Sequence, residues 1–222
     1  MWFVKNMITR KNLMALTGLF LAFFLIIHLL GNLQLLLPDE VAREQYNWYS
    51  HLLAGNIIIE IIAIVLYACI LLHLADAIYL TIRGRKVSGN YRLDKRARAS
   101  TWYSRNMMFL GAVIFAFLVI HFKDFWYQYK FGTLPLDEKG HKDLYTLVVT
   151  AFGQLWYVIV YIIAIIALGY HMLHGVFSAH RTLGLYHPVY NRIVRTAGVV
   201  FSVAMTFGYA VIPIVIYIKQ PL

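Results

Sequence analysis

The stretch NLMALTGLFLAFFLIIHLLGNLQLLLP, residues 12–38, contains no Asp, Glu, Lys or Arg. A helix that crosses the ~30 Å hydrocarbon layer of a bilayer needs about 20 residues, so this stretch is long enough to span it. It is also longer than the apolar region of a cleaved signal peptide, and we expect it to remain as a membrane helix. The composition of the whole chain agrees: 61% of the 222 residues are hydrophobic, 14% are charged and the mean hydropathy is +0.66. These values exclude an ordinary water-soluble domain and a disordered chain.

Four further apolar stretches follow, and the alternating pattern of a membrane β-barrel is absent. We therefore predict an all-α protein that forms one domain over residues 1–222. Its five transmembrane helices are expected at about 12–37, 56–83, 105–131, 145–180 and 195–219. The fourth apolar run, 144–180, is roughly 55 Å long as a helix, so part of it should project beyond the lipid.

The loops carry the net charge of +10, and they carry it unevenly. With the N-terminus inside, 14 of the 20 Lys and Arg residues lie on the inner side, eight of them between Arg83 and Arg105. The positive-inside rule then predicts a cytoplasmic N-terminus and an outer C-terminus. We expect a multi-pass protein of the inner (cytoplasmic) membrane, with lipid as its surroundings and no nucleic-acid partner.

The single cysteine, Cys69, excludes several redox centres. A disulfide framework, an iron–sulfur ligand set and a covalently attached c-type haem each need more than one cysteine.

Four of the nine histidines fall inside predicted spans at two matching depths. On helices that run outward, His28 and His121 lie roughly 25 Å from the inner boundary. On helices that run inward, His73 and His171 lie roughly 15 Å from it, which leaves about 10 Å between the two levels. An ionisable residue inside a membrane is a candidate functional site, although any single histidine could instead hydrogen-bond a neighbouring helix.

Two facing imidazoles at one depth suit the two axial positions of a haem iron inside a helical bundle. Filling both positions leaves no place for a substrate, so this arrangement predicts electron transfer between two stacked haems. Small residues follow His73 and His171, the histidines at the inner level. Gly18 and Gly111 each precede a histidine at the outer level by ten residues, and this shared spacing is a weak internal repeat. His174 is an alternative ligand to His171. The other histidines are expected at the inner boundary (His180) or in solvated loops (His51, His141 and His187).

Around these histidines the chain resembles the cytochrome b membrane-anchor subunit of succinate dehydrogenase and fumarate reductase, of the single-chain, five-helix, two-haem type. The resemblance lies in MALTGLFLAFFLIIHLLGN (14–32), LLHLADAIYL (71–80), FAFLVIHFKDFW (115–126) and YHMLHGVFSAHRTLG (170–184). It implies two haems b, with iron held by His73 and His171 at the inner level and by His28 and His121 at the outer level, and it favours His171 over His174. Asp76 departs from the family pattern. Its carboxylate could pair with a basic residue such as Arg83, or it could act as a buried proton acceptor, and both interpretations stay open.

The resemblance also implies partners. A flavoprotein subunit and an iron–sulfur subunit would dock on the cytoplasmic face, and electrons would pass in either direction between them and a menaquinone near the outer face. This chain has no residues for dicarboxylate chemistry, and assembly of the complex into a higher oligomer stays open. The basic residues Arg83, Arg105 and Arg181 lie where the propionates of the inner haem could bind, and the inner loop could contact the partner or anionic lipid.

A quinone site needs an apolar pocket and a group that moves protons. Glu60 is the candidate for that group, because it lies beyond the outer histidine level by about 10 Å. A carboxylate that simply reaches the outer interface is an equally good interpretation. Weaker candidates lie at a similar depth: Asn32, Gln34, His51 and Trp126.

Two other functions are compatible with parts of this pattern. A two-haem cytochrome b subunit of another quinone-linked oxidoreductase, of the nitrate reductase or hydrogenase type, would share the haem sites but not the inner partner. A proton or metal transporter with a histidine relay would instead be expected to show broken helices, and only Pro213 interrupts a span.

Overall fold

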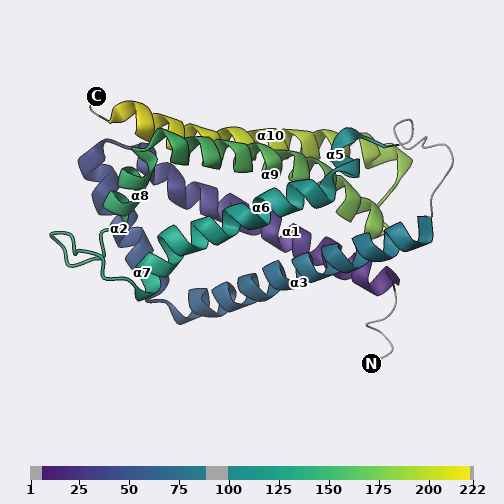
Figure 1. Cartoon of the computed structure of the whole chain (residues 1–222), viewed down its shortest axis with the longest axis horizontal. Helices are drawn as coiled ribbons and strands as arrows, with labels where there is room; N and C mark the ends of the chain where they lie inside the picture. Colours follow the sequence, from purple (N-terminus) through teal and green to yellow (C-terminus); the bar gives the residue numbers. More distant parts are fainter. Residues whose placement is uncertain (1–6, 89–99, 221–222) are drawn as a thin grey trace.

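The computed structural model describes residues 7–88 and 100–220, which form an elongated helical bundle (Figure 1). Within these residues every regular element is helical, apart from an isolated β-bridge between Leu136 and Lys142. Five segments are long and apolar enough to cross a membrane: Met7–Leu36, Ile57–Lys86, Met107–Phe131, Leu155–Thr182 and Pro188–Lys219. The predicted all-α fold with five spans is thereby confirmed, and a multi-pass membrane protein is supported.

The elements follow the chain as α1 (Met7–Asn32), η2 (Leu33–Leu36), α2 (Asp39–Ala54), α3 (Ile57–Ser88), α5 (Trp102–Arg105), α6 (Met107–His121), η3 (Phe122–Trp126), α7 (Tyr127–Phe131), α8 (Leu144–Phe152), α9 (Leu155–Thr182) and α10 (Pro188–Lys219). Five of the basic residues counted on the inner side lie outside the described residues: Lys5, Arg92, Lys95, Arg96 and Arg98.

Successive long helices run in opposite directions, so α1 begins at one end of the bundle and α10 finishes at the other (Figure 1). We call the end where α1 begins the inner end and the opposite end the outer end. The short helices α2, α7 and α8 lie at the outer end, and α5 lies at the inner end (Figure 1).

The helix boundaries differ most from the sequence prediction at three places, besides an earlier start of α1 and a later end of α3. The long fourth run divides into α8 and α9, because Gln154 has extended backbone angles (φ −103°, ψ 117°). The stretch Asp39–Ala54, expected as a loop, forms α2. The last helix begins at Pro188 rather than near residue 195, since proline is well placed at the first position of a helix and the His187 side chain accepts a hydrogen bond from the Val189 N–H.

Helix α9 is the centre of the bundle and packs against α10, α6 and α1, while α1 also packs against α3. The largest cluster of buried apolar side chains lies in the outer half. We call it the outer core: Leu35, Tyr46, Phe125, Val148, Phe152, Tyr157, Val158, Tyr161, Ile165, Ile212 and Ile216. The membrane-facing sides of α3 and α10 stay apolar and exposed, as a lipid-facing surface requires.

A polar cluster closes the outer end between α2 and the start of α8. We call it the outer cap: Arg43, Asn47, Asp137, Asp143 and Thr146. Asn47 is fully buried and donates to Asp143 at 3.1 Å, and Arg43 forms an ion pair with Asp143 at 2.6 Å. Burial alone would raise the pKa of Asp143, but hydrogen bonds from Asn47, Thr146 and Arg43 outweigh burial and hold that pKa below its ordinary value.

Candidate functional site

The histidines predicted at the outer level lie beside each other in the bundle. His28 projects from α1 and His121 is the last residue of α6, and their ring centroids are 5.8 Å apart with the ring planes at 88°. We call them the outer pair. Six aromatic rings lie around the two imidazoles: Phe24, Phe117, Phe122, Phe125, Tyr161 and Tyr209. A π-helical turn, η3, follows His121 directly, and such turns are frequent at functional sites.

The histidines predicted at the inner level also meet. His73 of α3 and His171 of α9 have ring centroids 6.1 Å apart, with the planes at 61°. We call them the inner pair. His171, and not His174, is therefore the histidine whose ring lies beside that of His73.

The separation within each pair matches that of two ligands on one metal ion. An imidazole nitrogen binds a first-row metal at about 2.0 Å, so two imidazoles on opposite sides of one ion have ring centroids about 6 Å apart. Both observed separations agree with this value. Among residues 7–88 and 100–220, no three His, Cys, Asp or Glu side chains are grouped to hold a bare metal ion. A metal at either pair would need further donors, such as the four nitrogens of a porphyrin.

Glycines on α1 and α6 lie against the inner pair. A Cβ added at Gly18 would lie 3.2 Å from Cε1 of His73, and one added at Gly111 would lie 4.0 Å from Cε1 of His171. Each glycine precedes an outer-pair histidine by ten residues, which is about 15 Å of helix. The glycines therefore mark the level of the inner pair on α1 and α6, about 15 Å along these helices from the outer histidines, and they leave room beside the inner imidazoles.

Hydroxyl groups hold one histidine of each pair by its Nδ1 atom. Thr17 donates its hydroxyl hydrogen to the backbone oxygen of Leu13 at 2.9 Å, so its oxygen is free to accept from Nδ1–H of His73 at 3.2 Å. At the outer pair, the Tyr161 hydroxyl lies 3.2 Å from Nδ1 of His121. A histidine that donates through Nδ1 keeps the lone pair of Nε2 for a metal.

His171 differs from these, because its buried Nδ1 has no hydrogen-bond partner among the described residues. Such an unpartnered polar atom is uncommon in a folded protein. The donor set, the spacing within the pairs and the glycines together fit two haems, one that His28 and His121 would hold and one that His73 and His171 would hold.

Asp76 is paired with Arg10, a partner that the sequence analysis did not find. Arg10 Nη1 lies 2.5 Å from Asp76 Oδ1, and the Asp76 side chain is only 3% exposed. The Arg10 guanidinium also lies over the ring of Tyr79, 4.2 Å from its centroid. Arg83, one partner considered for Asp76, instead donates to the Tyr79 hydroxyl at 2.6 Å.

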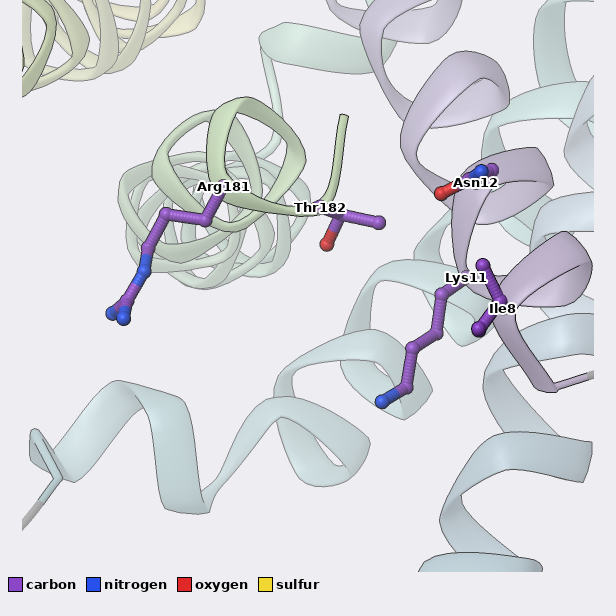
Figure 2. Close-up of a pocket in the computed structure, with 5 residues that line it drawn as sticks. All are labelled: Ile8, Lys11, Asn12, Arg181 and Thr182. Atoms are coloured by element: carbon purple, nitrogen blue, oxygen red, sulfur yellow. The ribbon is translucent and has the colours of Figure 1, made fainter. Parts of the chain in front are cut away.

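The three arginines considered for haem propionates all lie near the inner end. Arg83 is exposed on α3, and Arg105 donates to the backbone oxygen of Ser100. Arg181 stacks over the rings of Phe177 and Tyr186 and lines an open pocket of about 290 Å³. Figure 2 shows this pocket between α9 and α1, with Lys11 on the opposite side from Arg181. In this view the Arg181 side chain extends away from Lys11, so the two positive charges do not converge in the pocket.

Glu60 lies in the first turn of α3, at the outer end, and is about half exposed. Its carboxylate forms an ion pair with Lys130 of α7 at 3.2 Å. Two turns further along α3, the Tyr67 ring packs edge-on against Trp126, with centroids 5.6 Å apart. Glu60 thus combines a titratable group with neighbouring aromatic rings, while its ion pair with Lys130 also agrees with the purely structural interpretation.

The weaker quinone candidates have structural partners. Asn32 donates to the His28 backbone oxygen at 2.7 Å, and Gln34 donates to the Gly31 oxygen at 3.1 Å, so both stabilise the end of α1. His51 lies on α2 rather than in a loop, and its ring centroid is 4.8 Å from that of His141. His141 is part-buried, so it is not the solvated loop residue that the sequence predicted.

Comparison of the chain with models of protein families, with curated proteins and with solved structures gave no match. The functional argument therefore depends on the residues of this chain. Its strongest observation is that four histidines from four helices meet as two pairs, at two levels of one bundle.

Proposed function

We propose that this chain is the cytochrome b membrane-anchor subunit of a succinate:quinone oxidoreductase. His28 and His121 would hold one haem b and His73 and His171 a second, and the bound haems would supply one-electron transfer. The inner end would face the cytoplasm and receive the iron–sulfur and flavoprotein subunits. A quinone, by resemblance menaquinone, would react near the outer end.

The single observation that carries this proposal is the spacing of the two histidine pairs. Two imidazoles with centroids 5.8 or 6.1 Å apart match the spacing expected for two histidines that share one iron. With the four nitrogens of a porphyrin as the further donors, such a haem would serve electron transfer rather than substrate binding. Two such pairs at levels about 15 Å apart along α1 and α6 favour electron transfer along the bundle axis. A relay of histidines for proton or metal transport would not require this spacing within each pair.

The residues around the pairs have supporting roles in this proposal. Thr17 and Tyr161 fix the Nδ1–H tautomers of His73 and His121, which orients their Nε2 atoms toward an iron. Lys11 and Arg181, on α1 and α9 at the inner end, would offer positive charge to propionates or to an acidic partner surface.

The first experiment is an absorption spectrum of the protein purified from its native membrane, with a haem assay. We expect b-type absorption bands and two haems per chain, and reduction of these haems by succinate in the intact complex. A colourless protein, or haem that does not respond to succinate in the complex, would contradict the proposal. Reduction by a different donor but not by succinate would indicate another quinone-linked oxidoreductase.

The second experiment tests the quinone site. Glu60→Gln should abolish quinone-linked turnover while both haem spectra persist, because the amide cannot exchange the proton that quinone reduction requires. Glu44→Gln is the matched control, since Glu44 is also an exposed outer carboxylate and pairs with Lys139. Unchanged turnover in Glu60→Gln would remove Glu60 from the mechanism without affecting the haem assignment.

A further inference from the structure

A chain of hydrogen bonds connects the outer pair with the outer boundary of the bundle. His121 Nδ1 lies 3.2 Å from the Tyr161 hydroxyl, which lies 3.3 Å from the Tyr157 hydroxyl. The Tyr157 hydroxyl in turn donates to Asp124 Oδ2 at 3.2 Å. Tyr157 and Tyr161 are only 4% and 6% exposed, so the middle of this chain is shielded from water.

The carboxylate sets the direction of every bond in this chain. An ionised Asp124 can only accept, so Tyr157 donates to it and the Tyr157 oxygen is left to accept from Tyr161. The Tyr161 oxygen must then accept from Nδ1–H of His121. The carboxylate at the end of the chain is in an ion pair with Lys123, whose ammonium lies 3.4 Å from Asp124 Oδ1.

We propose that Tyr161, supported by Tyr157 and Asp124, is a positioning residue for His121 that lowers the reduction potential of the outer haem. This inference rests on the proposed function. An imidazole whose N–H is donated to such a chain is a stronger donor through its other nitrogen, and a stronger donor stabilises the oxidised iron. Within residues 7–88 and 100–220 the inner pair has no comparable chain, because the oxygen that accepts from His73 belongs to Thr17, which passes its own hydrogen to the backbone of α1.

The same tyrosines also belong to the outer core, where the Tyr161 ring packs edge-on against Phe117 and Phe152 at 4.8 Å. A purely structural role would therefore affect stability but not the potential of one haem alone. Tyr209 offers a matched control. Its ring lies 6.1 Å from that of His28, but its hydroxyl donates to the backbone oxygen of Leu25 at 2.7 Å and takes no part in the chain.

The experiment is a redox titration of both haems in the purified complex, for Tyr161→Phe, Asp124→Asn and the control Tyr209→Phe. In Tyr161→Phe we expect the outer haem to become about tenfold easier to reduce, which for a one-electron couple is a rise of about 59 mV. Asp124→Asn should shift it in the same direction by a smaller amount. The inner haem in all variants, and the outer haem in Tyr209→Phe, should keep their potentials.

An unchanged outer potential in Tyr161→Phe, or an equal shift in Tyr209→Phe, would overturn the inference. If Tyr161→Phe does not assemble, the Asp124→Asn variant provides the test, since Asp124 is at the partly exposed end of the hydrogen-bond chain. An unchanged potential of the outer haem in Asp124→Asn would also overturn the inference. Wild-type protein without haem would contradict the proposed function itself. If the protein holds two haems but their potentials do not change in these variants, the result would contradict only the role of Tyr161.

Discussion

The inner and outer halves of the bundle hold similar histidine pairs in very different surroundings. The outer pair lies against the outer core and is connected through Tyr161 to a chain of polar groups. The inner pair lies beside the glycines of α1 and α6, with one nitrogen of His171 unpartnered and one ion pair, Arg10–Asp76, holding α1 to α3 nearby. Similar ligand geometry therefore does not require similar packing, and the two ends should respond differently to substitution.

Removal of the histidines should produce the largest effects. If the chain holds two haems as proposed, His73→Ala or His171→Ala should each eliminate the inner haem and leave the outer haem, because each haem would need both histidines of its pair. His28→Ala or His121→Ala should do the reverse. A haem assay with low-temperature absorption spectra distinguishes the two, and loss of both haems from every variant would contradict independent sites.

The outer-pair variants should also be the less stable of the two sets. His121 packs against Phe117 and Phe125, whereas the inner pair is not part of the outer core. Thermal unfolding in one detergent should give a lower midpoint for His121→Ala than for His73→Ala. Equal midpoints would show that the aromatic packing around the outer pair adds no stability.

The Arg10–Asp76 ion pair should account for the next largest effect. Arg10→Ala leaves a carboxylate that is 3% exposed without its partner, and we expect a loss of about 3 kcal/mol in the free energy of unfolding. The double variant Arg10→Leu/Asp76→Leu should recover most of that loss, because no unpaired charge remains. Chemical or thermal unfolding in detergent measures both.

Lys139→Ala at the outer end is the control for this ion pair, since Lys139 and Glu44 are both more than half exposed and such pairs contribute at most about 1 kcal/mol. If Arg10→Ala proves no more harmful than Lys139→Ala, the buried pair is not what holds α1 to α3.

Glycine substitutions should give a smaller and more local difference. Gly18→Ala places a Cβ 3.2 Å from His73, tighter than ordinary contact, and should cost about 1–3 kcal/mol or displace the imidazole. Gly111→Ala places its Cβ 4.0 Å from His171, an ordinary contact, and should be neutral or slightly stabilising. Haem content and the inner haem spectrum measure the effect, and an equal response to both substitutions would rule out close packing at Gly18.

Acid should weaken the outer cap, which lies outside the spans. Because the pKa of Asp143 is held below its ordinary value, its interactions stabilise the folded cap at pH values above about 4 and are lost as the pH falls through the lowered pKa. Hydrogen exchange of α2 and α8 should therefore accelerate below pH 4 in the wild type. In Asp143→Asn it should already be fast at pH 6, and a wild type whose exchange does not change below pH 4 would contradict this role.

Much of the architecture was predictable from the chain because hydropathy and length are local properties. Residues 12–38 and the later apolar runs predicted the five spans, and a rise of 1.5 Å per residue placed His28 level with His121 and His73 level with His171. The split between α8 and α9 was predictable only in part. The apolar run 144–180 is longer than a membrane span, so part of it had to extend beyond the lipid, but nothing in its composition identified Gln154 as the break.

The positioning groups were not predictable, although one pattern pointed toward them. Tyr157 and Tyr161 are four residues apart on an apolar helix, so their hydroxyl groups form a polar stripe on one face of it. Asp124 follows His121 by three residues and adds a second polar position where lipid-facing residues would be expected. Which way that stripe faces depends on the rotation of α9 about its own axis. Arg10 was missed for a similar reason, because it was counted as an inner boundary charge while its long side chain reaches Asp76 on the neighbouring helix.

The sequence by itself determined that the chain is a five-helix membrane protein with histidines at two levels, since burial in lipid and helical rise depend on each segment alone. Only the tertiary structure decided that the rings meet in pairs, that His171 rather than His174 lies beside His73, and that Tyr161 lies against His121. These contacts join residues on different helices, and the rotation and crossing of those helices come from the packing of all their side chains together.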